Sequence, residues 1–183
     1  MRYLYIMYRH LSHNPKIERV IKRQLIRGES SEKMIWHQLI LGHTSFSKNS
    51  YDIAANTYSQ ILARYKRSPF MHFMMAVTYL QHATKRTTKS QKYMIALQGV
   101  AFLKQYVKLS HHSLESLYNL ARGLHLMGVY SSAQILYEKI IHRVRRTRRQ
   151  SSEHEGDANA VMRYCAYNLS KIYLRAGQQQ LAI

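Results

Sequence analysis

The chain has 183 residues, of which 46% are hydrophobic, so it is long and apolar enough for one domain with a buried core. Its 28 lysines and arginines outnumber 9 acidic residues. The formal net charge of +19 predicts an acidic protein or nucleic acid as partner, or else lysines and arginines that only solvate the outer faces of helices. No apolar run approaches the roughly 18 residues of a membrane-spanning helix, and the N-terminus lacks the layout of a signal peptide. The single cysteine, Cys165, excludes an internal disulfide and fits a reducing compartment.

The first 33 residues contain two segments with basic, amphipathic character. Residues 1–15 fit the second helix of a repeat whose first helix is missing, which predicts that another chain or a longer sequence covers this end. Residues 16–33 place Ile17, Val20 and Ile21 on one face of a basic inserted helix. Two interpretations of this insert stay open: an extra helix that lies on the fold, or an arm that binds nucleic acid or a partner protein.

The middle of the chain predicts two helix–turn–helix repeats of unequal length. The first repeat occupies residues 34–67. The second, residues 68–110, begins with Pro69 at a helix start, where the missing N–H of proline is harmless. It contains a polar and basic insert over residues 85–92, which we expect to be a loop between the two helices. We predict helices over about 34–47, 50–64, 69–83 and 93–109.

Residues 113–141 carry the clearest repeat. Ser113 caps its first helix, and Gly128 ends that helix where the chain must turn tightly. A basic and polar loop is predicted over residues 142–157, and residues 158–183 form an incomplete last repeat whose first helix spans about 160–176. The large and small positions of the clear repeat follow the tetratricopeptide pattern at Leu117, Leu120, Ala121, Leu124, Gly128, Tyr130, Ala133, Tyr137 and Ile140.

Small residues recur at one position of each predicted first helix, at Gly42, Ala76, Ala121 and Ser170. The first spacing is 34 residues, and the next two are 45 and 49. Because the tetratricopeptide period is about 34 residues, the surplus in the two longer spacings matches the two inserts. We therefore predict an all-α fold: one tetratricopeptide-repeat solenoid over residues 1–183, with three full repeats and a half-repeat at each end.

Some motifs in these helices are more specific than the general repeat pattern. Two of them are the segments Gln98–Leu103 and Tyr118–His125. With these motifs, residues 4–183 resemble the C-terminal repeat region of the tetratricopeptide subunit of transcription factor IIIC, the factor that recognises internal promoters for RNA polymerase III. The subunits of that family are far longer, and the insert at 16–33 is not one of their features. The residues that carry the likeness are 4–5, 8–13, 41–43, 96–103, 118–125 and 167–173.

The resemblance implies a non-catalytic scaffold that assembles the factor at RNA polymerase III promoters, helps transcription initiation and acts in the nucleus. It implies other protein subunits of a transcription-factor complex as partners, with weak or indirect DNA contact, and neither a membrane nor a small-molecule substrate. Two alternatives remain open. One is a general tetratricopeptide adaptor that binds an acidic peptide tail, as co-chaperones do. The other is a basic helical-repeat protein that binds nucleic acid directly, for which affinity falls steeply with salt.

Helical phase predicts a binding groove on the third and fourth repeats, next to the core positions. Asn119 and Asn168 occupy equivalent positions and have the donors and acceptors to bind a peptide backbone or carboxylate. The alternative is that both asparagines only tie neighbouring helices together. We expect an acidic or carboxylate-bearing protein segment in this groove, which is lined by Glu115, Tyr118, Asn119, Arg122, His125, Tyr164, Tyr167, Asn168, Lys171 and Arg175.

A run of arginines follows the third repeat. Because like charges at such density repel one another, we expect a solvated loop that contacts phosphate, serves as a nuclear-import signal, or only maintains solubility. The arginines of this candidate loop are Arg143, Arg145, Arg146, Arg148 and Arg149.

The sequence offers no pattern for catalysis, a metal or a cofactor. A histidine and a carboxylate are suitably spaced at His112 and Glu115, but a metal site there lacks a further ligand. Cys165 lies on a packing helix and is expected to be a small core residue, not a nucleophile. Met71, Met74 and Met75 are expected to fill the core. We therefore predict that the protein is not an enzyme and has no cofactor.

Overall fold

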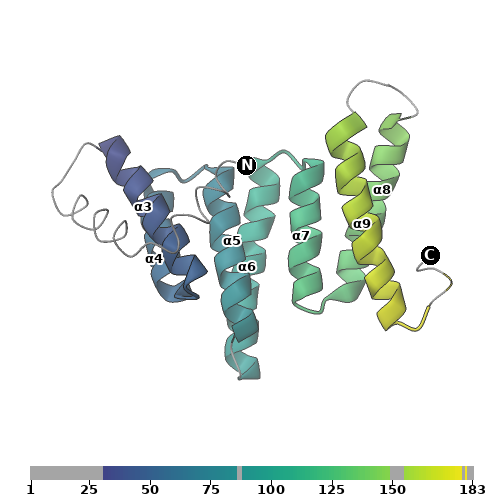
Figure 1. The fold of residues 1–183 in the computed structure, drawn as a ribbon, viewed down its shortest axis with the longest axis horizontal. Coiled ribbons are helices and arrows are strands. Elements are labelled where there is room, and N and C mark those ends of the chain that lie inside the picture. Colours follow the sequence, from purple (N-terminus) through teal and green to yellow (C-terminus); the bar gives the residue numbers. More distant parts are fainter. Residues whose placement is uncertain (1–30, 86–87, 149–154, 179, 181–183) are drawn as a thin grey trace. The chain divides into compact units, whose positions relative to one another are not determined.

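All regular secondary structure in the described part of the chain is helical (Figure 1). The computed structural model describes residues 31–85, 88–148, 155–178 and 180, so the predicted half-repeat at 1–15 and most of the insert at 16–33 lie outside it. The all-α prediction is confirmed. The chain divides into two compact units, residues 1–102 and 103–183, with the boundary inside α6. The helices are α3 (Ser31–Ser47), α4 (Tyr51–Arg64), α5 (Pro69–Lys85), α6 (Lys89–Leu109), α7 (Leu114–Leu126), α8 (Tyr130–Arg148) and α9 (Glu155–Arg175).

In the first unit, α3 packs against α4 at a place where one residue must be small. Gly42 is buried under the ring of Tyr58, and a Cβ atom at Gly42 would lie 2.5 Å from Tyr58 Cε1. The ring is fully buried, and its hydroxyl bonds His43 Nδ1 at 2.6 Å. Glycine at this position therefore lets the two helices approach each other closely.

The core of the first unit continues from α4 into α5. Ala54, Tyr58 and Ile61 of α4 pack with Met71 and Met75 of α5, and all five are buried. Met74 is partly buried and lies against the same cluster, so the three methionines fill the core as predicted. Ser68 lies before Pro69, and its hydroxyl accepts a hydrogen bond from the Met71 N–H at 3.3 Å.

The contact between α5 and the first part of α6 also depends on a small residue, because a Cβ atom at Gly99 would lie 2.8 Å from Leu80 Cγ. Ala76 of α5 is fully buried. One turn along from these residues, the rings of Tyr79 and Phe102 stack with their centroids 5.7 Å apart. Gly99 and Phe102 of the Gln98–Leu103 motif thus pack α6 against α5.

The predicted basic loop at residues 85–92 is wrong in extent. Helix α5 runs to Lys85 and α6 begins at Lys89, so the helices are separated only by residues 86–88. The Lys92 N–H already donates to the Thr88 carbonyl at 3.1 Å, which is the first helical bond of α6. Lysine is a good helix former, and no glycine or proline interrupts this stretch. The charged and polar residues of this stretch therefore indicated exposure to solvent, and they did not indicate a loop.

The second unit is built on the antiparallel pair α7 and α8, with α9 packed on α8 and touching α7. Ser113 caps α7 as predicted, since its hydroxyl accepts from the Ser116 N–H at 3.2 Å. Gly128 has φ +82°, the left-handed conformation expected at the turn between the two helices. The buried core consists of Val107, Leu117, Ala121, Ala133, Tyr137, Ile140, Val144, Cys165 and Ile172.

The predicted arginine loop is also wrong, because α8 continues through the run to Arg148. Val144 is buried one turn after Ile140 and extends the apolar face of the helix. Arg143, Arg145 and Arg146 are exposed, so water separates their charges, and Arg143 donates to the His112 carbonyl at 2.9 Å. The buried valine inside the run is the signal that favours a helix. The backbone of Arg148 is helical, and Arg149 lies outside the described residues.

The last helix starts earlier than expected. Helix α9 begins at Glu155 and not near residue 160, so the insert predicted at 142–157 is shortened from both ends. Gly177 has φ +73° and repeats the turn glycine of the third repeat. Ser170 is only half-buried, and its hydroxyl donates to the Tyr167 carbonyl at 2.9 Å. Its expected partner helix lies mostly outside the described residues, so the fourth small position stays a prediction.

Candidate protein-binding face on α7 and α9

Three cationic side chains lie on the neighbouring helices α7 and α9. Arg122 belongs to α7, whereas Lys171 and Arg175 are one turn apart on α9, and all three are exposed. We call these three residues the cationic face. No acidic side chain forms an ion pair with any of them within the described part of the chain. Their charge is therefore available to an external anion.

The charge of this face affects the pKa of His125. Burial lowers the pKa of its imidazole, and Arg122, Arg175 and Lys171 lower it further in that order. The three cations have this effect because like charges disfavour the protonated form of the ring. His125 also contacts Tyr137 and Tyr130 edge-on, so it forms part of the floor of the face. His125 Nδ1 also lies 3.5 Å from the Tyr137 hydroxyl, within hydrogen-bonding distance.

Asn168 is a tether between the two helices and not a ligand-binding side chain. It is 4% exposed, and its Oδ1 accepts from Arg122 Nη1 at 3.1 Å. Its Nδ2 donates to the Tyr118 hydroxyl at 3.2 Å and to the Tyr164 carbonyl at 2.8 Å. For Asn168, the helix-tying interpretation is therefore correct, and its predicted place in a partner-binding groove is wrong. The physical reason is burial, since a partner cannot reach an amide that is already bonded inside the fold.

Asn119 makes a weaker contact of the same kind. Its Nδ2 donates to the Tyr106 hydroxyl at 3.5 Å, and the side chain is half-buried. Glu115 is exposed in the first turn of α7, two helical turns before Arg122, and it contributes to raising the pKa of Tyr106 after the larger effect of burial. The N-terminal end of the predicted groove is thus acidic and partly used for helix contacts. The accessible cationic part lies at Arg122 and beyond.

Tyrosines flank the cations and add apolar area to the face. Tyr164 and Tyr167 are 58% and 59% exposed. Lys171 Nζ lies 4.2 Å from the centroid of the Tyr167 ring, and its hydrogen bond and charge lower the pKa of that tyrosine. Arg175 Cζ lies 5.4 Å from the centroid of the Tyr130 ring, and its guanidinium donates to the Tyr130 hydroxyl. Such pairs hold a lysine and an arginine in place over aromatic surfaces.

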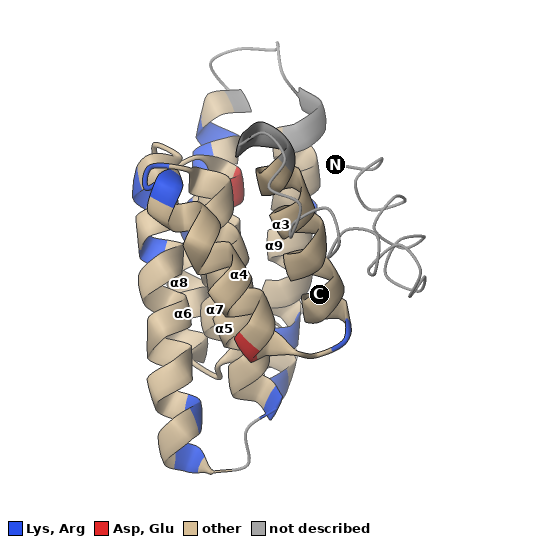
Figure 2. Cartoon of the chain, turned by 90° about the vertical axis from the view of Figure 1, so that its left-hand side faces the viewer, with Lys and Arg blue, Asp and Glu red and all other residues tan. Residues whose placement is uncertain are grey.

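Sequence reasoning does not assign Tyr130 to the site. Its signal is its place directly after the turn of the third repeat, but the repeat pattern alone gives it a packing role. Figure 2 shows lysine and arginine positions along several of the described helices, whereas aspartate and glutamate mark few places. Positive charge alone therefore does not distinguish the cationic face from the other basic positions. What distinguishes it is that its three cations all lower the pKa of His125.

The described residues offer little for metal or nucleophile chemistry. Over those ranges, no group of three histidine, cysteine, aspartate or glutamate side chains is placed to hold a metal ion. Cys165 is fully buried as predicted, and burial raises the pKa of its thiol to about 12. At neutral pH such a thiol stays protonated and is a poor nucleophile. None of the described helices has the length and apolarity that crossing a bilayer requires.

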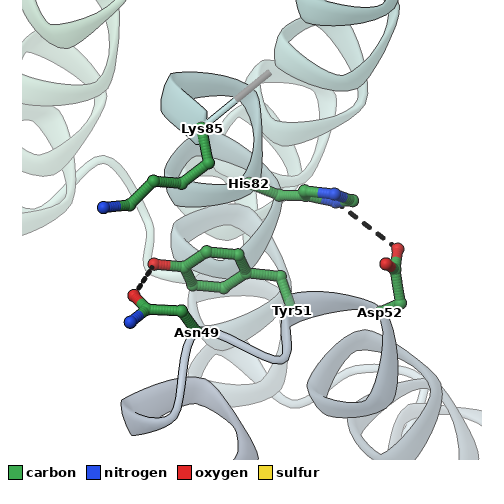
Figure 3. A pocket seen from close by; sticks show the side chains of 5 residues that line it. All are labelled: Asn49, Tyr51, Asp52, His82 and Lys85. Atoms are coloured by element: carbon green, nitrogen blue, oxygen red, sulfur yellow. Dashed lines mark hydrogen bonds and ion pairs between the residues drawn. The ribbon is translucent and has the colours of Figure 1, made fainter. Parts of the chain in front are cut away.

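A polar hollow in the first unit was not predicted. It has a volume of about 380 Å³ and is lined by Asn49, Tyr51, Asp52, His82 and Lys85. Figure 3 shows the Tyr51 hydroxyl directed at Asn49 Oδ1, 2.7 Å away, and the His82 ring near Asp52, with Nδ1 and Oδ1 3.6 Å apart. The contact between His82 and Asp52 joins the end of α5 to the first turn of α4, whereas the bond between Tyr51 and Asn49 stays within the turn that opens α4. The hollow therefore lies at the junction of α4 and α5.

The helix pairs, their small crossing residues and their turn glycines define a tetratricopeptide-repeat protein. A crystal structure of a thermophilic TPR protein from Thermus thermophilus superposes with a TM-score of 0.66 over 98% of this chain and 83% of that chain, at 13% identity. The fold is thus an all-α tetratricopeptide-repeat solenoid, as predicted. No family model matches the sequence.

Three transcription-factor subunits are similar to the chain in sequence. General transcription factor 3C polypeptide 3 of Homo sapiens is 30% identical over 141 residues, or 77% of this chain. Transcription factor tau subunit sfc4 of Schizosaccharomyces pombe is 29% identical over 153 residues, or 79%. The 131 kDa subunit of transcription factor tau of Saccharomyces cerevisiae is 25% identical over 120 residues, or 62%. These similarities confirm the predicted resemblance to the tetratricopeptide subunit of transcription factor IIIC.

The chain spans only part of these relatives. It covers 16% of the human protein, 15% of the fission yeast protein and 10% of the budding yeast protein. The names of the relatives and the repeat fold together indicate no enzyme family.

Proposed function

We propose that the chain is a non-catalytic scaffold of a nuclear transcription-factor complex that helps assemble the factor at RNA polymerase III promoters. In this proposal, the cationic face on α7 and α9 holds an acidic or carboxylate-bearing segment of another subunit. The sequence similarity to transcription-factor subunits supports the complex and the nucleus. The tetratricopeptide fold supports capture of a protein segment, because stacked repeats present extended binding surfaces.

The observation that carries the mode of binding is the set of three cations around His125, none of which has an ion pair with another described residue. A carboxylate suits this set, since a guanidinium presents a planar fork of donors and an ammonium adds a point charge. Tyr164 and Tyr167 would cover the apolar part of the same segment, because large aromatic rings are favoured in the centre of interfaces. A neutral or basic segment would leave the cations without partners in the interface.

Charge reversal tests the proposal. Arg122 is unsuitable on its own because it bonds Asn168, so its loss disturbs the fold as well as the face. We therefore choose the double variant Lys171→Glu/Arg175→Glu and a matched control, Lys108→Glu/Lys139→Glu, whose exposed lysines lie elsewhere in the same unit. Tagged chains would be expressed in cells of the source organism, and co-purifying subunits would be quantified by mass spectrometry.

The expected result is that the site variant loses its co-purifying transcription-factor subunits by at least about tenfold while the control retains them, and that both keep the helical circular dichroism of the wild type. Equal recovery with both variants would refute the cationic face. Co-purification of chaperones in place of transcription-factor subunits would instead favour the general adaptor and refute the assembly role.

A second candidate function, direct contact with nucleic acid, has one specific observation in its favour. Arg143, Arg145 and Arg146 are exposed on an ordered helix and not on a loop, which fixes their spacing. If they contact phosphates, log–log plots of duplex DNA affinity against salt should be steep, and Arg145→Ala/Arg146→Ala should reduce the slope by about 2. A shallow slope that the variant leaves unchanged would exclude this function for α8.

A further inference from the structure

The outer side of α6 carries a group of exposed apolar side chains in its first three turns. Tyr93, Met94 and Leu97 are 67%, 62% and 65% exposed, and Ala101 is exposed one turn further along. Tyr93, Leu97 and Ala101 follow one another at intervals of four residues, so they share one face of the helix. Met94 lies beside them on the same face. We call these four residues the α6 stripe.

Folding of the first unit does not account for the α6 stripe. The residues of α6 that contact α5 are others, among them Gly99 and Phe102, and Ala96 is buried. Large apolar side chains that are exposed singly need no explanation, but neighbouring ones on one helix face mark an interaction surface. Tyrosine and methionine are moreover enriched in the centres of protein interfaces.

The charge around the α6 stripe selects its partner. Lys89 is exposed four residues before Tyr93, on the same face, and Lys92 borders the stripe. Every charged residue between Asp52 and Glu115 is a lysine or an arginine. A partner with acidic side chains beside an apolar edge would therefore meet apolar groups and complementary charge together.

We propose that the α6 stripe docks an amphipathic helix of another protein, whose apolar edge is bordered by aspartate and glutamate. A single exposed helix face suits a second helix packed along it, with apolar anchors spaced at three or four residues. A second copy of the chain would bring the same lysines against each other. Residues 1–30 of this chain are also rich in lysine and arginine, so charge disfavours them as the occupant. This surface is distinct in residues and helix from the cationic face on α7 and α9.

A pair of synthetic peptides tests the proposal on the 183-residue chain. Both are amphipathic helices of about 18 residues, roughly 27 Å long, with leucines along one edge. One has glutamates beside the leucines, and the other has lysines at the same positions. Binding is measured by fluorescence anisotropy of the labelled peptide. We expect the glutamate peptide to bind at least about tenfold more tightly than the lysine peptide. Equal binding, or no binding of the glutamate peptide, would overturn the proposal.

Two substitutions locate the bound peptide. Leu97→Asp should lower the affinity for the glutamate peptide by at least about tenfold. Ile135→Asp, at a 63% exposed position of α8, should leave the affinity for this peptide unchanged. Circular dichroism checks that both variants keep their helices. An equal effect of the two substitutions would contradict a specific site. Loss of binding in Lys171→Glu/Arg175→Glu would place the peptide on the cationic face and likewise overturn the proposal.

Two further measurements exclude the other occupants. Sedimentation should give the same mass for the wild type and Leu97→Asp. A wild-type dimer that the substitution dissociates would instead identify a second copy of the chain on the stripe. A synthetic peptide of residues 1–30 should fail to displace the glutamate peptide, and displacement would identify that segment as the occupant. Either contrary result would refute a foreign acidic helix.

Discussion

Gly42→Ala is the substitution for which the structure gives the sharpest expectation. The added Cβ atom would lie 2.5 Å from Tyr58 Cε1 and 3.0 Å from Cδ1 and Cζ of the same ring. The ring is fully buried and held by its hydrogen bond to His43, so it cannot swing aside as a flexible side chain does. Either the ring or the α3 backbone must therefore move.

The magnitude follows from two opposing effects. Overpacking a well-filled contact costs about 1–3 kcal/mol. Replacing glycine by alanine inside a helix contributes about 0.8–1.0 kcal/mol in the other direction, since alanine has the higher helix propensity. Because the clash involves the middle of a rigid ring, we expect the cost to lie in the upper part of its range. The free energy of unfolding should then fall by about 1–2 kcal/mol.

A double-mutant cycle separates the two effects. Urea unfolding followed by circular dichroism would be measured for the wild type, Gly42→Ala, Tyr58→Leu and the double variant. Leucine lacks the ring atoms that the new Cβ meets, so Gly42→Ala should be neutral or slightly stabilising in that background. If the substitution destabilises both backgrounds equally, or destabilises neither, the close approach of α3 and α4 is not what requires glycine, and the reasoning fails.

Three other predictions follow from the second unit. Asn168→Leu should lower the free energy of unfolding by about 1–3 kcal/mol in urea titrations because it leaves Arg122 and Tyr118 without their buried partner, whereas Asn119→Leu should cost less than about 1 kcal/mol. Cys165 should resist iodoacetamide at about pH 8 in the native chain and react fully in denaturant, as measured by mass spectrometry, since burial raises the pKa of its thiol to about 12. Burial and neighbouring cations hold the pKa of folded His125 below its ordinary 6.5, so the unfolded state binds more protons and the free energy of unfolding should fall as the pH drops below 6.5. Unfolding curves of His125→Gln should show a smaller fall. An equal fall in the variant would refute this contribution.

The repeat architecture was predictable because it rests on the spacing of large and small residues. Gly42 is buried at the contact between α3 and α4, Ala76 and Ala121 are fully buried, and Gly128 has the expected left-handed conformation. These positions are fixed by geometry that every helix pair shares, since two helices can cross closely only over small side chains. Periodicity reports such constraints directly.

The boundaries of the inserts were less predictable, for a physical reason. Charge predicts loops for both basic stretches, yet lysine and arginine favour helices when water screens them. A single buried residue, Val144, shows that the helix continues into the arginine run. Composition describes what a segment exposes, whereas a helix needs only one apolar anchor each turn to remain packed.

The binding site was only partly predictable because one helix face contains both internal ties and accessible groups. Asn119 and Asn168 each donate to a tyrosine hydroxyl on a preceding helix, although only Asn168 is buried. Asn168 also accepts a hydrogen bond from Arg122, so it orients one cation of the face while it holds α7 beside α9. Removing it should therefore weaken partner capture at temperatures where the chain is still fully helical. Capture that persists unchanged until unfolding would show that the cations act without this support.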